Sequence, residues 1–516
     1  MNNMRVSTNG GLVTENWFDL NASRYTASST LQRMELLKTG YMGTLSLGWD
    51  NYLFLELTGR QERSSTLKDQ SFFYPSANLS FLFSNAFRMP AWWNHGKLRL
   101  SYGVVGNAPE TYAANIIYEQ GSDNGFTWNY VPSSWGNANI RPEKKYEYEI
   151  GFESKFLNNR LGFDVSYYNN RVKDQILSTP QPSTSGVKYV LMNVGEVANE
   201  GWDISVSATP VLTKNFRWDL TANYGIYRNK VVKLADGVPY LEISNIGGGG
   251  AKIQAVEGRP MGDIYVQVPQ MNENGEYLVS DKGLYMNQTE LQRVGNINPD
   301  GVGGLFSSFS YKNIFLDFSI DFRIGGDVIN EMYQYSTASG LTPESLQFRD
   351  TEHGGLSYYY PGNNNASGVP VQVDPSLGAG PNGETVYHDG VILPGVVAST
   401  GEKNTRIIPA GYYYNQTYNW GTQPEQLTYR HSVFDNSYVK LRELTIGYQF
   451  PEKLISKLGM TRLSVSVFGR NLFYFYKALK NYDAESSVGT SWASQAVVGG
   501  STTATRNFGV SLRASF

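Results

Sequence analysis

The sequence ends in a strict alternation between apolar and polar side chains. Residues 506–516 read RNFGVSLRASF, and the apolar positions are Phe508, Val510, Leu512, Ala514 and Phe516. Because successive side chains of a strand point to opposite faces, this period of two predicts a strand with one apolar face and one polar face. A soluble sheet and a membrane barrel both produce such a strand, so the rest of the chain must decide between them.

The same alternation recurs along the chain and predicts about thirteen strands. The clearest segments are residues 43–50, 52–60, 77–84, 97–105, 146–154, 161–167, 202–209, 216–226, 316–324 and 461–470. In residues 437–450 the alternation changes phase at the adjacent polar residues Arg442 and Glu443. A β-bulge at this point is the simplest explanation of the phase change.

The connections between these strands alternate between short and long. The short ones are residues 50–52, 157–160, 210–215 and 311–313, and the long ones are residues 107–143, 174–198, 229–302, 326–436 and 471–504. This asymmetry is typical of an outer-membrane barrel, with short periplasmic turns and long extracellular loops. We therefore expect a barrel portion over residues 33–516, preceded by an extracellular loop segment at residues 1–32.

The strand order also predicts a direction for each end of the chain. If the last strand runs toward the periplasm, the first strand, at about residues 33–50, runs the same way and the chain starts outside. A complete barrel has an even number of strands and both ends in the periplasm. The amino terminus also lacks the basic start and apolar core of a secretory signal. Both observations predict that the first strands of the barrel lie outside this sequence.

Composition excludes several classes of function. The chain has no cysteine, so it holds no disulfide, zinc-finger site or thiol catalyst. Its net charge is −3 with only 17% charged residues, which argues against nucleic acid as a partner. Mean hydropathy is −0.37, and no apolar run approaches the length of a transmembrane helix. Half-polar strands and wet loops account for this low mean hydropathy.

We find no catalytic, metal or cofactor signature. His95, His353, His388 and His431 show no metal-ligand spacing, and we expect them to be loop residues. The glycine run at residues 247–250 lacks the spacing of a phosphate loop, which predicts flexible loop. No Ser-His-Asp arrangement stands out, and acidic residues on strands are explained by a wet barrel interior. We therefore expect a protein that is not an enzyme and binds no cofactor or metal.

Aromatic side chains in the longest loop are the one hint of a binding site. These residues, Tyr358, Tyr359, Tyr360, Tyr412, Tyr413, Tyr414 and Trp420, all fall between residues 326 and 436. Their rings can stack on sugars, and loop packing or contact with a partner protein are the alternatives. Aromatic residues at strand ends, such as Trp49, Tyr167, Trp202 and Trp218, are expected in the interfacial girdles of a barrel.

Several segments resemble the SusC/RagA family of TonB-dependent transporters of Bacteroidetes. They are LFLELTGRQERSS at 53–65, GKLRLSYGVVGN at 96–107, KFLNNRLGFDVSYYNNRVKD at 155–174, NVGEVANEGWDI at 193–204, EGRPMGDIY at 257–265 and SYVKLRELTIGYQF at 437–450, with GRNLF and NYD between 468 and 483. Their order is similar to that in the carboxyl-terminal half of the family along nearly the whole chain. The terminal strand also resembles the assembly signal of outer-membrane barrels, carried by Phe508, Val510, Leu512 and Phe516.

This resemblance implies a multi-pass protein of the bacterial outer membrane. The expected fold is all-β, the carboxyl-terminal part of a 22-stranded transmembrane antiparallel barrel without its plug domain. The implied function is import of glycans or peptides, with a SusD-like surface lipoprotein and, through the missing amino-terminal part, the TonB complex. The barrel assembly machinery and outer-membrane lipid are further implied partners. A secreted carbohydrate-binding protein and a passive porin or adhesin are the alternatives.

Overall fold

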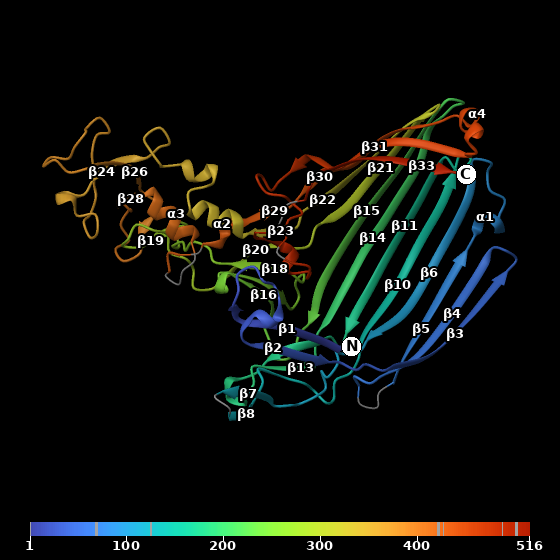
Figure 1. Cartoon of the computed structure of the whole chain (residues 1–516), viewed down its shortest axis with the longest axis horizontal. Coiled ribbons are helices and arrows are strands. Elements are labelled where there is room, and N and C mark those ends of the chain that lie inside the picture. The colour runs from blue at the N-terminus through green and yellow to red at the C-terminus, as the bar shows by residue number, and fades with distance from the viewer. Residues whose placement is uncertain are drawn as a thin grey trace.

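A single antiparallel sheet of thirteen strands dominates the described part of the chain (Figure 1). The structure is a computed structural model that describes residues 2–67, 71–123, 126–419, 424–426, 428–487, 489–500 and 504–516. Each strand of this main sheet pairs with the next strand of the sheet along the chain. In order, the strands are β3 (Lys38–Trp49), β4 (Leu53–Ser64), β5 (Ser71–Phe81), β6 (Trp93–Asn107), β10 (Glu143–Phe156), β11 (Leu161–Lys173), β14 (Glu196–Leu212), β15 (Phe216–Lys233), β21 (Gly301–Tyr311), β22 (Ile314–Ile324), β30 (Tyr438–Gln449), β31 (Arg462–Lys477) and β33 (Asn507–Ser515). The large antiparallel sheet predicted from the alternation is thus confirmed.

The register of the main sheet separates its side chains into two faces. In β10, Glu147 and Glu149 lie directly across from Asn170 and Tyr168 of β11. The side chains between them point to the other face of the sheet, because successive side chains of a strand point to opposite faces. We call the side of Glu147 the polar face and the side of Ile150 the apolar face. The two outermost strands, β3 and β33, do not pair with each other within the described residues.

The connections at the two ends of the sheet differ in length, as the sequence predicted. At the turn end, the strands are joined by residues 50–52, 82–92, 157–160, 213–215, 312–313 and 450–461. The tight turn at 157–160 has positive φ at Leu157, Asn158 and Asn159, a conformation that asparagine tolerates better than most residues. At the loop end, the connections include residues 108–142, 174–195, 234–300, 325–437 and 478–506. Figure 1 shows the loops gathered at one end of the sheet, with α1 and α4 at the other.

The predicted β-bulge in β30 is present. Glu443 lies across from Ser319 of β22, and Leu441 lies across from the next residue, Ile320. Arg442 is therefore the extra residue of the bulge, and it interrupts the pairing with β31 as well.

The loops contain their own secondary structure, apart from the main sheet. Residues 2–33 form a hairpin, β1 (Asn2–Leu12) and β2 (Ser23–Arg33), in the segment that the sequence assigned to an extracellular loop. The other short strands are β7 (Glu119–Asp123), β8 (Phe126–Tyr130), β9 (Ser134–Trp135), β12 (Ile176–Pro180), β13 (Tyr189–Asn193), β16 (Tyr240–Ile246), β17 (Ala251–Val256), β18 (Asp263–Val266), β19 (Leu278–Val279), β20 (Gln292–Asn296), β23 (Asp327–Asn330), β24 (Leu356–Tyr359), β25 (Val371–Gln372), β26 (Val386–Val391), β27 (Val396–Val397), β28 (Ile408–Pro409), β29 (Val433–Asp435) and β32 (Val497–Val498). The α-helices are α1 (Phe83–Ala86), α2 (Glu331–Ala338), α3 (Ala410–Tyr418) and α4 (Glu452–Ile455).

Most of the fully buried apolar residues lie in the loops, although Val231 of β15 is also fully buried. One cluster combines residues of three loops that are far apart in the sequence: Ile253 and Ile264, Ile329 and Tyr429, and Val497. Strands β29, β23 and β32 form a small sheet that joins the last two of these loops. The three long loops therefore share one core. In the described ranges, no helix combines the length and the apolar composition needed to cross a membrane.

Candidate functional site

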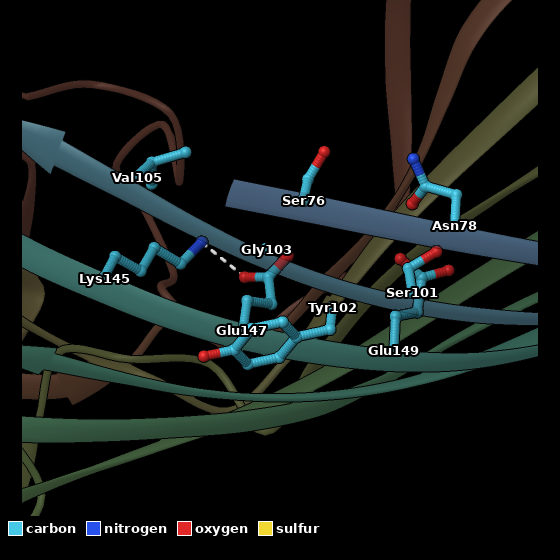
Figure 2. A pocket seen from close by; sticks show the side chains of 9 residues that line it. All are labelled: Ser76, Asn78, Ser101, Tyr102, Gly103, Val105, Lys145, Glu147 and Glu149. Carbon is cyan, nitrogen blue, oxygen red and sulfur yellow. Dashed lines mark ion pairs between the residues drawn. The ribbon is translucent and has the colours of Figure 1, made fainter. Parts of the chain in front are cut away.

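The polar face of the main sheet carries open cavities lined by charged and hydroxyl side chains. One cavity of about 340 Å³ lies over β5, β6 and β10 and includes Ser76, Ser101, Lys145, Glu147 and Glu149 (Figure 2). The Lys145 ammonium and the Glu147 carboxylate form an ion pair of 2.5 Å within it. A second cavity, of about 650 Å³, continues from the same three β10 residues across β11, β14 and β15. The polar face is thus built to contact water and polar solutes.

Ion pairs connect neighbouring strands on this face. Arg99 of β6 donates to Asp164 of β11 at 2.6 Å and to Glu153 of β10 at 3.4 Å. Its guanidinium also donates to the hydroxyl of Ser166 at 3.1 Å. The space for this side chain exists because the residue between the strands is Gly151, where a Cβ would meet the guanidinium at 2.8 Å. One arginine therefore holds three strands in register.

The bulge in β30 holds a segment of the last long loop against the polar face. Arg442 is hydrogen-bonded to the carboxylate of Asp321 in β22, and its Nη1 donates to Oε2 of Glu485 at 2.9 Å. Burial opposes ionisation of Glu485, but hydrogen bonds from Arg442 and Lys440 keep the pKa of this carboxyl below its usual value. Since a bulge redirects the side chain of its extra residue, it lets Arg442 reach both carboxylates.

Further contacts hold the same segment, which we define as residues 482–486. The hydroxyl of Tyr474 in β31 donates to Asp483 at 2.5 Å, and the Asn436 side-chain amide donates to the Ala484 carbonyl at 3.0 Å. The segment is therefore attached to β30 and β31 of the main sheet and to the residue Asn436 that precedes β30.

A buried carboxylate organises the loops. Asp263 is fully buried and accepts hydrogen bonds from Arg259 at 2.6 Å, Arg293 at 2.8 Å and the Asn296 amide at 2.9 Å. Burial by itself raises the pKa of Asp263, but these three donors together hold it below the ordinary value. The carboxylate thus stays charged at the centre of the β16–β17–β18–β20 sheet.

The first group of predicted aromatic residues lies in a small sheet of the longest loop. Tyr358 is only 1% exposed, stacks on Tyr387 with ring centroids 5.5 Å apart, and donates to Asp389 at 3.1 Å. Burial, with the nearby Asp389, raises the pKa of Tyr358. Tyr360 packs edge-on against the same two rings, while Tyr359 and Tyr360 are half-buried. This placement favours loop packing for Tyr358.

The second group lies on α3. Tyr414 is buried and its hydroxyl donates to the Glu344 carbonyl at 2.8 Å, while Tyr413 packs beside it with ring centroids 4.9 Å apart. Tyr412 is 36% exposed. Trp420 lies outside the described residues. Among the predicted contact residues described, Tyr358 and Tyr414 are buried, whereas Tyr359, Tyr360, Tyr412 and Tyr413 are at least partly exposed. The role of these residues stays a prediction.

The terminal strand has the expected geometry. Phe508, Val510 and Leu512 of β33 lie across from Gly469, Val467 and Val465 of β31 and are at least two-thirds exposed. Phe516 follows the strand and is 82% exposed. The predicted strand is confirmed, and its role in assembly stays a prediction.

The predicted girdle aromatics gather at both ends of the apolar face. Tyr167 and Trp202 pack together toward the loop end, with ring centroids 4.9 Å apart. Toward the turn end, Trp218 stacks on Phe309 at 5.4 Å, and Trp49 is the last residue of β3. On β14, Val211 follows Trp202 by nine residues and lies across from Trp218 of β15. Nine residues span about 30 Å along a strand. For a tilted strand, this length suits an apolar band about 25 Å tall.

The four histidines are dispersed. The expectation that all four are loop residues is wrong for His95, which lies in β6 of the main sheet. In the long loop 325–437, His353 contacts Asp350 at 2.7 Å, His388 contacts Ser357 at 2.8 Å, and His431 packs on Tyr418. Across the part of the chain that the structure describes, His, Asp and Glu form no group of three or more that could hold a metal ion.

Sequence reasoning did not single out the charged residues of the polar face. Arg99, Lys145, Glu147 and Arg442 each occupied an ordinary polar position in the alternation. The phase change at Arg442 was the one available signal, and it indicated a bulge but not the carboxylates that the bulge brings within reach.

Comparison with known proteins identifies the fold. The family model of the TonB dependent receptor-like beta-barrel matches residues 5–264, half of the chain. The curated TonB-dependent receptor P3 of Formosa agariphila is 22% identical over 494 residues, which cover 87% of this chain and 42% of that protein. TonB-dependent receptor SusC of Bacteroides thetaiotaomicron is 27% identical over 256 residues, which cover 43% of this chain and 24% of SusC.

Solved structures agree with this assignment. A structure of the RagAB peptide transporter has a TM-score of 0.69 at 19% identity, with 96% of this chain and 50% of that chain covered. The chain thus spans half or less of the length of these relatives. The two-faced antiparallel sheet, the family model and the shared fold lead to one conclusion: the chain belongs to the family of TonB-dependent receptor β-barrels.

Proposed function

We propose that residues 33–516 form part of the wall of a TonB-dependent outer-membrane transporter that imports oligosaccharides or peptides. The loop end would face outside the cell, and a SusD-like surface lipoprotein would cooperate with it. Energy would come from the TonB complex. The hairpin at residues 2–33 would belong to the extracellular loops.

The separation of the two faces of the main sheet carries this proposal. On the apolar face, Leu100, Ile150 and Phe508 expose large apolar side chains over many neighbouring strands. A soluble protein rarely exposes a contiguous apolar surface of this extent, whereas a barrel wall presents it to lipid. The opposite face carries ion pairs and cavities that suit a hydrated passage for polar solutes.

The relatives support the class of substrate. The RagAB structure is that of a peptide transporter, and SusC is a TonB-dependent receptor. The polar face mixes carboxylates, cations and hydroxyl groups, which form hydrogen bonds with sugars and with peptide groups alike. Tyr359, Tyr360 and Tyr412 would add ring surfaces at the entrance.

Deletion of the gene in the bacterium that encodes it tests this function. Uptake of fluorescent oligosaccharides and fluorescent peptides is measured in the wild type, the deletion strain and a strain without TonB. We expect uptake of one of the two substrate classes to be lost in both mutant strains. Complementation with the gene should restore this uptake in the deletion strain. If uptake is lost in the deletion strain but is unchanged in the strain without TonB, the result would instead support a passive porin.

A further inference from the structure

A cluster of cations lies on the apolar face, where the strands meet the loops. We define the basic patch as Lys144 of β10, Arg171 and Lys173 of β11, and Arg228 and Lys230 of β15. Four neighbouring strands, β10, β11, β14 and β15, form the surface beneath it. Cations on the lipid side of a barrel require an explanation, because that side otherwise contacts acyl chains.

The register places all five residues on the apolar face. Lys144 lies across from Lys173, and Tyr146 lies across from Arg171. Arg228 lies across from Glu200 of β14 and Lys230 from Ala198. Counting back in steps of two along these strands reaches Ile150, Tyr167, Trp202 and Ile226, which belong to the apolar face.

The aromatic girdle separates the patch from the apolar band. Tyr167 and Trp202 pack together just below the cations, and Tyr148 lies beside them on β10. Amphipathic rings of this kind mark the level of lipid headgroups. The basic patch therefore lies at or just above headgroup level on the loop side.

The patch carries more positive charge than its own side chains neutralise. It holds five cations, and the same surface offers two carboxylates, Glu196 and Glu200. Glu196 pairs with Arg171 at 2.9 Å, while Glu200 accepts a hydrogen bond from the Tyr167 hydroxyl at 3.2 Å. Among the described contacts, Lys144, Lys173, Arg228 and Lys230 form no ion pair.

The cations of the basic patch repel one another when no anion is bound between them. Lys144 and Lys173 are directly opposed on paired strands, where like charges destabilise a sheet. Arg228 and Lys230 are two residues apart on one strand and on the same face, so their Cα atoms lie about 7 Å from each other. A multivalent anion between such pairs removes the repulsion, and a guanidinium beside ammonium groups suits phosphate.

We propose that the basic patch binds the phosphate groups of a phosphorylated lipid in the outer leaflet. The acyl chains of this lipid pack on the apolar band below the girdle, and its headgroup phosphates lie among Lys144, Lys173, Arg228 and Lys230. The acyl chains distinguish this ligand from free phosphate, because the apolar surface directly adjoins the cations. The inference rests on the proposed outer-membrane location of the chain.

Lipid binding to the purified full-length transporter tests the inference. Native mass spectrometry in detergent compares phosphorylated lipid A with the same lipid after phosphatase treatment. The test variant carries K144Q, K173Q, R228Q and K230Q. A matched control removes four cations at the turn end, through K214Q, K312Q, K453Q and K457Q. Heat-dependent gel mobility and outer-membrane fractionation report on folding and location for each protein.

We expect the wild type and the control to prefer the phosphorylated lipid by at least about tenfold, since each cation near a membrane surface contributes about 1 kcal/mol. The test variant should lose most of this preference and keep its heat-dependent mobility. The lipid inference would be overturned if the wild-type protein is a folded outer-membrane barrel that binds both lipids equally, or if the test variant binds like the wild type. Either result would leave the proposed transporter function intact. A chain that stays outside the outer membrane would overturn both proposals.

Discussion

At the scale of single residues, two charged groups organise parts of the molecule that are distant in sequence. Arg442 links β22, β30 and the segment 482–486, and Asp263 links three neighbouring stretches of one loop. In both groups opposite charges are held close together; Asp263 is fully buried, whereas Arg442 and Asp321 are each 32% exposed. The sequence indicated neither set of contacts. Asp321 lies 121 residues from Arg442. The segment EGRPMGDIY at 257–265 contains Arg259 and Asp263, but it did not indicate that they pair or that Arg293 joins them.

Arg442→Gln should release segment 482–486 from the polar face. We expect faster proteolysis within residues 478–506 and a loss of about 1–2 kcal/mol in unfolding free energy, because the variant leaves Asp321 and Glu485 without their shared cation. Arg470→Gln serves as the control, since its ion pair with Glu443 is more exposed and should contribute less than about 1 kcal/mol. Equal cleavage rates in the two variants would contradict the assigned role of Arg442.

Asp263 should make the loop core sensitive to acid. Its folded-state pKa lies below the ordinary value of about 3.9, so its stabilisation is complete above that pH and is lost as the pH falls through the lowered pKa. Amide exchange in β17 and β18, corrected for intrinsic rates, should stay constant from about pH 7 to 5 and accelerate below about pH 4.

Asp263→Asn should destabilise the loop core by about 3 kcal/mol at pH 7, since Arg259 and Arg293 then lack their counter-charge. Asp236→Asn is the matched control in the same loop, because that carboxylate is 94% exposed and its pair with Lys233 contributes little. Exchange rates that are equal in the two variants would refute the account of Asp263.

At the scale of strands, the period of two was sufficient to place most of the main sheet. Residues 216–226 and 316–324 were predicted as strands and lie within β15 and β22. The alternation stops being informative where both sides of a strand are covered by protein. In the loop core, β17 buries Ala251, Ile253, Gln254 and Ala255, so it lacks the two-faced pattern that marks a barrel strand.

Close packing between strands makes one glycine a sensitive position. A Cβ on Gly303 of β21 would meet the Phe322 ring at 2.4 Å and the backbone oxygen of Asn223 at 2.5 Å. Gly303→Ala should therefore cost about 1–3 kcal/mol, since the backbone oxygen cannot move without disturbing the β15–β21 pairing. Gly43→Ala is the control, because nothing lies within 4 Å of its added Cβ. The readout is the temperature at which the folded gel band disappears, and identical temperatures would count against the argument.

At the scale of the whole molecule, the main sheet forms a wall and three long loops form a cap, and the two parts arrange their apolar residues differently. The main sheet places polar residues on one face and apolar residues on the other, and this arrangement could be predicted from the sequence. The cap is a set of three loops with one shared core. It could not be predicted, because long-range contacts between irregular segments leave no periodic pattern. The exposed apolar band and the girdles at both of its ends are formed by residues of the main sheet, without the loops.

Cysteine scanning along β10 tests the central claim most directly, and the absence of cysteine from these 516 residues makes the chain suited to it. Single variants Glu147→Cys, Tyr148→Cys, Glu149→Cys, Ile150→Cys and Phe152→Cys are treated in intact outer membranes with a charged, water-soluble maleimide. We predict labelling at Glu147 and Glu149, and protection by lipid at Tyr148, Ile150 and Phe152. Equal labelling of both sets would show that both faces of this sheet meet water, and would contradict its assignment as the wall of a membrane barrel.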